Sequence, residues 1–415
     1  MNKEPLANDE MVVGNYGLRK GYKQTEVGLI PEDWDVKPLA SISEKIMVGI
    51  ASAATHAYRD KGIVLIRNQN IKAGYLDDSD VLYIDLDYEA SFKNKRLKYG
   101  DLLTARTGYP GTTCVVPEKY DSAQSFTTLV TRPNKEIIDS LFLCYYINSE
   151  HGQRFFEQSK IGGAQKNVNA GTLQKMPIPV SPFTEQRAIA TALSDVDALL
   201  AKLDQLITKK RDLKQATMQQ LLTGQTRLPR FSGEWKAKQL GDIAEIVMGQ
   251  SPSSLNYNSK GIGLPLIQGN ADILDRKTIK RIFTTEITKN GKCGDILMSV
   301  RAPVGEISRA LFDVCLGRGV CAIRYPNDFM YHYLISLEPT WARLSKGSTF
   351  DSVNSADVKA LDVYLPIMLE EQTAIATILS DMDIEITALE ARRDKTHDLK
   401  QGMMQELLTG RIRLV

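Results

Sequence analysis

Residues 185–228 have the sequence EQRAIATALSDVDALLAKLDQLITKKRDLKQATMQQLLTGQTRL, and residues 371–414 have the sequence EQTAIATILSDMDIEITALEARRDKTHDLKQGMMQELLTGRIRL. The two stretches align without a gap at an offset of 186 residues, and 24 of the 44 aligned positions are identical. Chance does not produce this level of identity, so the chain contains an internal duplication. The duplication decides the fold, because both copies must form the same kind of element.

Each copy has the apolar spacing of a long helix. Ile189, Val196 and Leu203 recur every seven residues, and further apolar residues are interleaved at the alternating spacing of a coiled-coil seam. Each copy ends at a Thr-Gly pair, where Gly224 and Gly410 relieve the left-handed conformation that closes a helix. We therefore predict two helices of about 38 residues, each on the order of 57 Å long.

Polar residues interrupt both seams. They are Lys210 and Lys214 in the first copy and Arg393, Thr396 and Lys400 in the second. We expect the packing there to be looser or to involve another contact. An antiparallel pair formed by the two copies is favoured, because the seam is long and a domain-sized stretch separates the copies. The alternative is that each helix packs on its neighbouring domain as ordinary core.

A weaker repeat precedes each helix. GLIPEDWDVKPLASI around Trp34 resembles RFSGEWKAKQLGDI around Trp235 at an offset of 201 residues. Because 201 − 186 = 15, the first variable stretch is 15 residues longer than the second. Further matches pair residues 64–71 with 265–273, 100–111 with 294–305, and 162–173 with 347–358. The chain therefore alternates a variable unit with a similar helix, twice.

The variable units have the pattern of mixed α/β domains. Short apolar runs bounded by Gly, Pro, Asn and Asp predict strands near 63–66, 81–84, 101–103, 112–116 and 127–131, and helical spacing covers 138–159 and 328–344. The predicted fold is α+β, with two pseudo-twofold-related mixed α/β domains separated by two long antiparallel coiled-coil helices. The expected boundaries are an extension at 1–21, domains at 22–180 and 225–366, and helices at 181–224 and 367–415.

The composition excludes several classes of protein. A chain of 415 residues that is 43% apolar and 25% charged is typical of a soluble protein with two or more domains. No apolar run reaches the roughly 18 residues of a membrane span, and the N-terminus lacks the apolar core of a signal peptide. Five cysteines without a C-x-x-C pair and four scattered histidines indicate reduced thiols, a cytoplasmic location and no metal site. The net charge of +2 does not identify a partner, although the basic runs at 91–106 and 276–292 permit contact with nucleic acid.

Catalytic motifs are absent from the sequence. It contains no Asn-Pro-Pro or Asp-Pro-Pro loop with the glycine-rich loop of an adenine methyltransferase, no G-x-x-x-x-G-K-[ST] phosphate loop and no G-x-S-x-G. Gly261-Ile-Gly263 and Gly317-Arg-Gly319 are lone glycine pairs and are interpreted as turns. The chain is therefore predicted to be a binding protein or scaffold rather than an enzyme.

Together, the G-x-I/F-P-x-x-W-like entry segments, the proline-containing exits and the E-Q…L-L-T-G helices resemble the specificity subunit of type I restriction-modification systems, from about residue 22 to 415. The resemblance implies that each variable unit is a target-recognition domain for one half of a split, asymmetric site in double-stranded DNA, and that the helices set the separation of the half-sites. It also implies docking of two modification subunits that methylate adenine at N6 and of restriction subunits that translocate and cut DNA. S-adenosylmethionine, ATP and Mg are then expected on those partners, and no cofactor on this chain. Residues 1–21 precede the usual start of the family.

Candidate DNA contacts are polar side chains in loops that recur in both copies, because base edges and phosphates are bound by such groups. Alternatives remain open: Asn68 and Asn70 could cap turns, Asn167 or Asn354 could brace the exit loop, and Tyr109 could be a wedge or a simple loop aromatic. The candidates are Arg67, Asn68, Asn70, Arg106, Lys160, Gln165, Lys166 and Asn167 in the first unit, and Gln268, Asn270, Arg301, Lys346, Ser348, Thr349 and Asn354 in the second.

Two other functions compete with a full restriction-modification role. The first is the specificity chain of a methylation-only system, which would lack a motor partner. The second is a scaffold that tethers proteins without binding DNA. Basic loops and interrupted seams disfavour the scaffold.

Overall fold

A computed structural model describes residues 20–52, 54–158, 168–347 and 353–414. Most of the predicted extension, residues 1–19, lies outside the described part. The chain divides into two compact units, one formed by Met1–Lys202 with Arg393–Val415 and the other by Leu203–Arg392. Both divisions fall inside a long helix, so each unit contains one variable domain, the start of one long helix and the end of the other.

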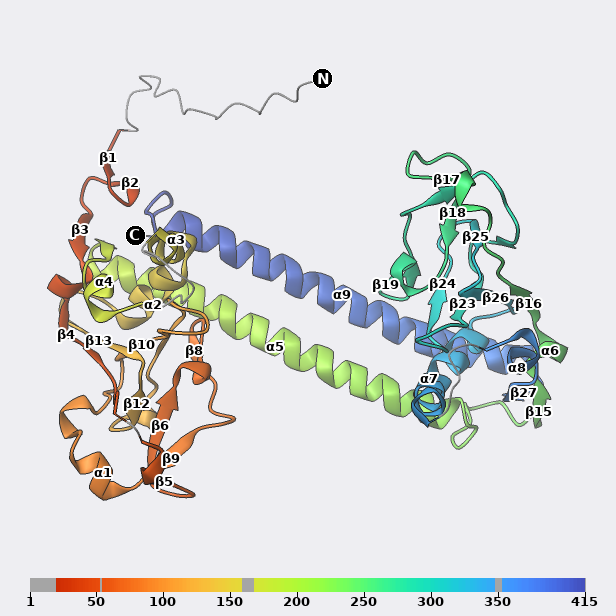
Figure 1. The fold of residues 1–415 in the computed structure, drawn as a ribbon, viewed down its shortest axis with the longest axis horizontal. Coiled ribbons are helices and arrows are strands. Elements are labelled where there is room, and N and C mark those ends of the chain that lie inside the picture. The colour runs from red at the N-terminus through yellow and green to blue at the C-terminus, as the bar shows by residue number, and fades with distance from the viewer. Residues whose placement is uncertain (1–19, 53, 159–167, 348–352, 415) are drawn as a thin grey trace. The chain divides into compact units, whose positions relative to one another are not determined.

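Unit 1 contains two four-stranded sheets (Figure 1). One is antiparallel throughout, in the order β11-β10-β13-β4, and the other has the order β12-β6-β9-β5 with β12 parallel to β6. Their strands are β4 (Ser43–Val48), β5 (Tyr58–Arg59), β6 (Ile63–Arg67), β9 (Leu82–Ile84), β10 (Leu102–Thr104), β11 (Thr113–Val115), β12 (Gln124–Phe126) and β13 (Leu129–Pro133). Three antiparallel pairs complete the unit: β1 (Tyr22–Thr25) with β2 (Gly28–Pro31), β3 (Asp35–Pro38) with β14 (Pro177–Val180), and β7 (Ile71–Lys72) with β8 (Tyr75–Leu76).

The short helices of unit 1 are α1 (Leu86–Ala90), α2 (Ser140–Asn148), α3 (Glu150–Gln158) and α4 (Ala170–Gln174). The sequence predicted one helix over 138–159, whereas the structure divides it at Ser149, which has an extended backbone. The Ser149 hydroxyl donates a hydrogen bond to the Tyr146 carbonyl at 2.7 Å, which satisfies a group at the end of α2.

Unit 2 repeats this topology. Its six-stranded sheet has the order β16-β26-β23-β24-β20-β19, in which the first four strands correspond to β4, β13, β10 and β11 of unit 1. Its five-stranded sheet has the order β17-β21-β18-β25-β22. The strands are β15 (Trp235–Gln239), β16 (Glu245–Met248), β17 (Tyr257–Asn258), β18 (Leu264–Ile267), β19 (Ile273–Leu274), β20 (Lys277–Thr278), β21 (Phe283–Thr284), β22 (Asn290–Gly291), β23 (Ile296–Ser299), β24 (Ile307–Arg309), β25 (Val314–Leu316), β26 (Val320–Arg324) and β27 (Asp362–Pro366), which pairs with β15. The helices are α6 (Leu240–Ile243), α7 (Phe329–Gly347) and α8 (Ser355–Lys359). The predicted duplication of a mixed α/β domain is confirmed.

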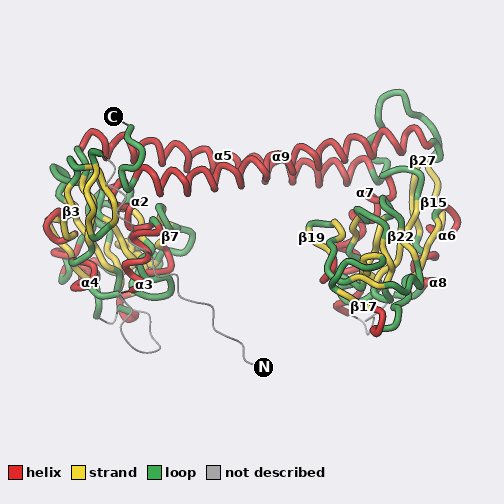
Figure 2. Tube along the Cα trace, turned by 90° about the horizontal axis from the view of Figure 1, so that it is seen from above, coloured by secondary structure: helices red, strands yellow, loops and turns green. Residues whose placement is uncertain are grey.

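The two long helices are α5 (Phe183–Leu221) and α9 (Leu369–Leu407), each of 39 residues. They lie side by side (Figure 2). Their pairing is antiparallel, because the ion pairs join higher residue numbers of α5 to lower residue numbers of α9. Asp197 and Lys400 form an ion pair of 2.6 Å within unit 1, and Lys214 and Asp383 form one of 2.5 Å within unit 2. Lys214 and Lys400, which interrupt the seams, therefore pair with aspartates across the helix pair, and the 186-residue repeat relates one ion pair to the other.

The ends of the long helices also enter the domain cores. Ile189 and Leu193 near the start of α5 and Leu407 at the end of α9 are buried in the same cluster as Phe142 of α2. In unit 2 the corresponding cluster contains Met218, Leu221, Ile375 and Leu379. The antiparallel pair is thus confirmed, and packing of each helix on a domain, which had been the alternative, occurs at the helix ends.

A cluster of tryptophan, glutamate and arginine joins the helix ends to each domain, and we call it the Trp-Glu-Arg clasp. In unit 1 the Trp34 indole donates to the fully buried Glu185 carboxylate at 3.1 Å, and Arg413 donates to the same carboxylate at 2.5 Å. Gly410 has φ +69°, and a side chain there would meet Pro31 at 2.5 Å. Glycine is therefore required both by its conformation and by the close approach of the domain.

Unit 2 contains the same clasp. Arg227 donates to the buried Glu371 carboxylate at 2.6 Å, and the Trp235 indole donates to it at 3.4 Å. Gly224, with φ +71°, lies against Trp235.

All five cysteines are free thiols, and four of them are buried. In the described part of the chain, no helix combines the length and the apolar character of a membrane span.

Candidate nucleic-acid interface

Three loops of unit 1 converge on a pocket of about 640 Å³. The first follows β6 and carries Arg67, Asn68 and Gln69; the other two are the β10–β11 loop and the turn between β12 and β13. The β7–β8 hairpin lines the remaining side. The sequence predicted that the first two loops contribute to a DNA site, and the structure brings them together.

Asn68 ties the three loops to one another. Its side-chain oxygen accepts the N–H of Arg106 at 2.8 Å, and its amide donates to the Thr127 hydroxyl at 3.2 Å. Thr127 has φ +54°, an uncommon conformation that this bond helps to hold. The turn-capping interpretation of Asn68 is thus part of its role, although the side chain also lines the pocket.

The other candidates of unit 1 differ in how far they are available to a ligand. Asn70 is only 2% exposed and bonds the Arg67 N–H and the Asp80 carbonyl, so its side chain stabilises the loop. Arg67 donates to the Asp80 carboxylate at 2.9 Å, and half-buried Arg106 donates to the Val168 carbonyl at 3.3 Å.

Tyr109 stands at the tip of the β10–β11 loop. It follows Gly108, which has φ +76°, and it is 85% exposed. Because the ring lies at the edge of the pocket and most of its surface is exposed, it is the aromatic group of this unit best placed to meet a ligand.

In unit 2 the same three loops form a pocket of about 160 Å³. The residues at its walls are Ser251, Gln268, Gly269, Asn270, Ser299, Arg301, Ala302, Arg318 and Gly319. Gln268, Asn270 and Arg301 were predicted from the sequence. Arg318 was not predicted, because Gly317-Arg-Gly319 was interpreted only as a turn. Ser251, which lies between β16 and β17, was not predicted either.

That turn is packed against the loop after β18. A side chain at Gly319 would lie 2.0 Å from the Gln268 carbonyl, and one at Gly317 would lie 3.0 Å from the Gln268 Cα. The N–H of Arg318 donates to the Ser251 hydroxyl at 3.2 Å. An arginine between two glycines, at a junction of short strands, was the signal in the sequence that indicated a side chain projecting from a closely packed turn.

The hydrogen bonds of the loops also define which residues of the two units correspond. The Ala105 N–H donates to the Thr112 carbonyl and the Ser299 N–H to the Glu306 carbonyl, so Arg301 corresponds to Thr107, as the match of residues 100–111 with 294–305 predicted. Asn70 corresponds to Asp272 rather than Asn270, because each accepts the N–H of the residue that ends the preceding strand or follows it directly. The loops match as predicted, and the side chains at equivalent positions differ between the units.

The remaining candidates lie elsewhere. The Asn354 side chain accepts the N–H groups of Ala356 and Asp357 and begins α8, which is the bracing role considered as its alternative. Lys346 lies in the last turn of α7, and its side chain is outside the described part. Also outside the described residues are Lys160, Gln165, Lys166, Asn167, Ser348 and Thr349.

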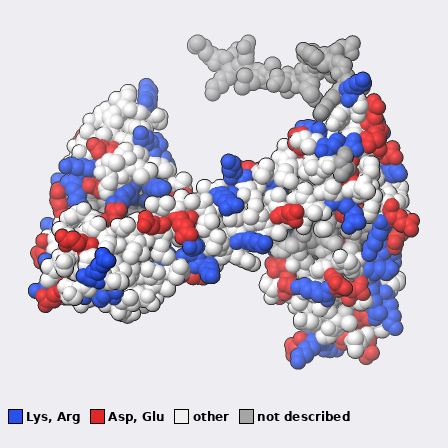
Figure 3. Space-filling view, turned by 180° about the vertical axis from the view of Figure 1, so that it is seen from behind, with Lys and Arg blue, Asp and Glu red and all other residues white. Residues whose placement is uncertain are grey.

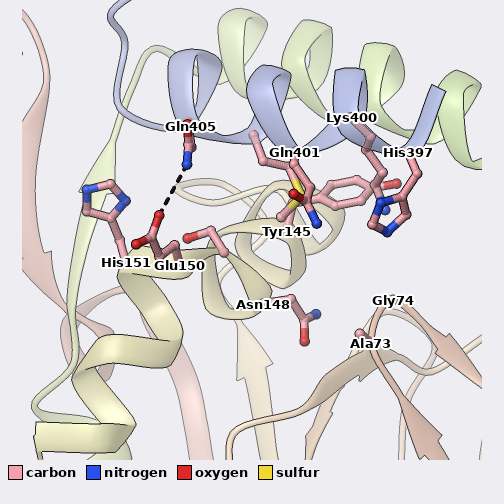
Figure 4. A pocket seen from close by; sticks show the side chains of 12 residues that line it. Ala73, Gly74, Tyr145, Asn148, Glu150, His151, His397, Lys400, Gln401 and Gln405 are labelled. Atoms are coloured by element: carbon pink, nitrogen blue, oxygen red, sulfur yellow. Dashed lines mark hydrogen bonds between the residues drawn. The ribbon is translucent and has the colours of Figure 1, made fainter. Parts of the chain in front are cut away.

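A second pocket of unit 1, of about 520 Å³, lies between α2–α3 and the end of α9 (Figure 4). Gln405 donates to Glu150 at 3.2 Å across it, and Lys400 is already paired with Asp197. Burial lowers the pKa of His151, which favours a neutral imidazole. Among the described side chains that line this second pocket, no lysine or arginine is left unpaired to bind a phosphate. The loop pocket of unit 2 differs in this respect.

The surface charge is mixed in sign. Acidic and basic side chains are intermixed on the face drawn in Figure 3. Within the described residues, no group of three or more His, Cys, Asp or Glu side chains has the arrangement of a metal site.

Two domains of one topology, each with polar loops around a pocket and each joined to a pair of long helices, define a duplicated binding protein. Residues 31–210 and 232–396 match the family model of the type I restriction modification DNA specificity domain. Because these matches cover most of the chain, the protein belongs to this family.

Similar proteins agree with that assignment. The chain is 30% identical over 417 residues to a protein of Methanocaldococcus jannaschii named for the MjaX type I restriction enzyme as its specificity subunit, covering 95% of this chain and 97% of the relative. A chain from a structural study of complex assembly and conformational transition in the type I R-M system is 25% identical, with a TM-score of 0.56 over 92% of this chain and 99% of that one. The S subunit of a type I system from M. genitalium has a TM-score of 0.60 at 16% identity, over 90% of this chain and 96% of that one, and supports the fold.

Proposed function

We propose that this chain is the sequence-specific DNA-binding subunit of a type I restriction-modification complex, and that each unit recognises one half of a bipartite, asymmetric target. The observation that carries the proposal is the repeated pocket: the same three loops form it in both units, yet the side chains at its walls differ. A common scaffold with different loops is what recognition of two different half-sites requires.

The proposed partners include two modification subunits, and repeated faces on the long helices support their docking. On α5 an exposed groove of about 550 Å³ is lined by Phe183, Ala188 and Ala192, among others. The repeat places Leu369, Ala374 and Ile378 at the matching positions of α9. Residues 185–195 and 371–381 have the same alternation of buried and exposed positions. Two equivalent faces with exposed apolar side chains fit two copies of one partner.

Exposed leucines extend the docking surface along α5. Leu199, Leu206 and Leu213 recur every seven residues and are 37%, 38% and 52% exposed. A stripe of this kind fits a further helix from a partner. We propose that methylation of adenine at N6 and ATP-dependent cleavage are carried out by partner subunits in the cytoplasm, with S-adenosylmethionine, ATP and Mg bound there and not on this chain.

Binding of duplex DNA by the purified chain together with its methyltransferase partner tests the proposal. The logarithm of the binding constant should fall linearly with the logarithm of the salt concentration, because phosphate contacts release counterions. It should also be higher for a duplex with the methylated motif than for a scrambled duplex. Absent or salt-insensitive binding would contradict DNA recognition and favour the scaffold.

A further inference from the structure

We propose that Arg301 and Arg318 bind a guanine edge, so that the half-site recognised by unit 2 contains a G·C pair; this inference rests on the function proposed above. Both residues line the 160 Å³ pocket and both are exposed. Among the described residues, neither guanidinium has an acceptor within hydrogen-bonding distance.

Four other arginines of the same domain are paired with carboxylates. Each of them donates to a carboxylate of the domain: Arg276 to Glu338, Arg281 to Asp272, Arg309 to Asp328, and Arg324 to Asp295 and Glu245. Arg301 and Arg318 thus differ from these neighbours, because within the described residues no acceptor occupies the five N–H donors of either guanidinium.

The backbone at both arginines is held in place. The Ser299 hydroxyl donates to the Arg301 carbonyl at 2.8 Å, and the Gly305 N–H donates to the Ser299 carbonyl at 2.8 Å to close the loop. The bond to Ser251 and the contact of Gly319 with Gln268 hold Arg318 in the same way. Binding therefore needs no ordering of the backbone, and the conformational entropy lost is that of the two side chains.

The surroundings favour a base edge over a phosphate. The other polar groups of the pocket are neutral amides and hydroxyls, with Gln268 donating to Tyr257 at 2.8 Å. Asn270 donates to Glu306, whose carboxylate at the pocket repels a phosphate but not a neutral base. In the major groove, guanine presents two adjacent acceptors, O6 and N7, and a guanidinium binds both.

Unit 1 lacks this pair. Arg301 corresponds to Thr107, and the turn Gly317–Gly319 has three residues where unit 1 has the two residues Phe126 and Thr127. Arg318 therefore lies in a turn that is one residue longer. The guanine site is specific to unit 2, which agrees with an asymmetric target.

The test is a map of adenine methylation in a host that expresses the chain with its methyltransferase partner, for the wild type and for Arg301→Ala, Arg318→Ala, Arg301→Lys and Arg318→Lys. In the wild type, one half of the motif should contain a G·C pair. Each alanine variant should lose discrimination at a G·C pair of that half by roughly 10- to 100-fold, while the other half is unchanged. The lysine variants should also lose discrimination at that G·C pair, because lysine keeps the charge of arginine but lacks its paired N–H donors.

Lys236→Ala on β15, which removes an exposed cation outside the pocket, is the matched control, and co-purification with the partner verifies that each variant folds. A uniform loss of methylation at all sites with an unchanged motif would indicate phosphate contact and overturn the inference, as would full discrimination in the lysine variants. A wild-type complex that produces no motif would instead overturn the proposed function itself.

Discussion

Arg413 and Glu185 lie far apart in the sequence and form an ion pair within unit 1. Glu185 is fully buried, and its carboxylate accepts hydrogen bonds from Arg413 and from the Trp34 indole. A buried carboxylate that loses its cation is left uncompensated, which costs more than the loss of an exposed pair. The Trp-Glu-Arg clasp is therefore expected to contribute to the stability of each unit.

Arg413→Ala should lower the free energy of unfolding of the full chain by about 2 kcal/mol, below the range for a fully buried pair because the Arg413 side chain is 32% exposed. Urea unfolding measures the change. Lys37→Ala is the control, since its ion pair with Asp35 is 3.9 Å long and exposed. Equal effects of the two substitutions would show that the clasp does not stabilise the unit.

The burial of His332 predicts that the free energy of unfolding depends on pH. It is 1% exposed, and burial followed by the charge of Lys214 lowers its pKa to about 4, while Asp383, Asp328 and Arg309 act in smaller, partly opposing ways. The unfolded chain binds a proton near the ordinary pKa of 6.5, before the folded chain does. Stability must therefore fall as the pH drops from about 7 to 4, by roughly 3 kcal/mol from this group.

His332→Gln should remove that part of the pH dependence of unfolding, measured with urea between pH 7 and 4. His397→Gln, at an exposed histidine of α9, is the control and should leave the slope unchanged. A wild-type slope in His332→Gln would mean that other groups cause the acid sensitivity.

At the scale of elements, α5 and α9 were predictable from the heptad spacing, but their ion pairs were not. Lys214 and Lys400 were recognised as interruptions of the seams. Their partners Asp383 and Asp197 could not be assigned, because the register of an antiparallel pair depends on the three-dimensional packing. The break at Ser149 was missed for a related reason, since a serine does not by itself end a helix.

A double-mutant cycle with Asp197→Ala and Lys400→Ala should give a coupling free energy of about 1 kcal/mol, because both side chains are partly buried. The exposed pair Glu234 and Lys236, in the same kind of cycle, should give less than about 0.5 kcal/mol. Unfolding in urea measures both. Additive substitutions at Asp197 and Lys400 would contradict the assigned register.

At the scale of the whole molecule, the repeat predicted the two domains and the two helices, because identical spacing requires identical elements. It did not predict the pockets in detail. The offset between the copies falls from 201 residues at the tryptophans to 194 at residues 100–111 and 186 in the helices, so only the local match at 100–111 pairs Arg301 with Thr107, and the hydrogen bonds of the two loops agree with that pairing. Arg318 was missed because its turn has an extra residue in only one copy.

The central claim, that this chain determines which DNA sequence is modified, is tested most directly by mapping adenine methylation in its source cells by long-read sequencing, with and without the gene. The predicted result is the loss of one split, asymmetric motif when the gene is removed, with all other methylated motifs retained. An unchanged map from cells that express the chain with its partners would contradict the claim.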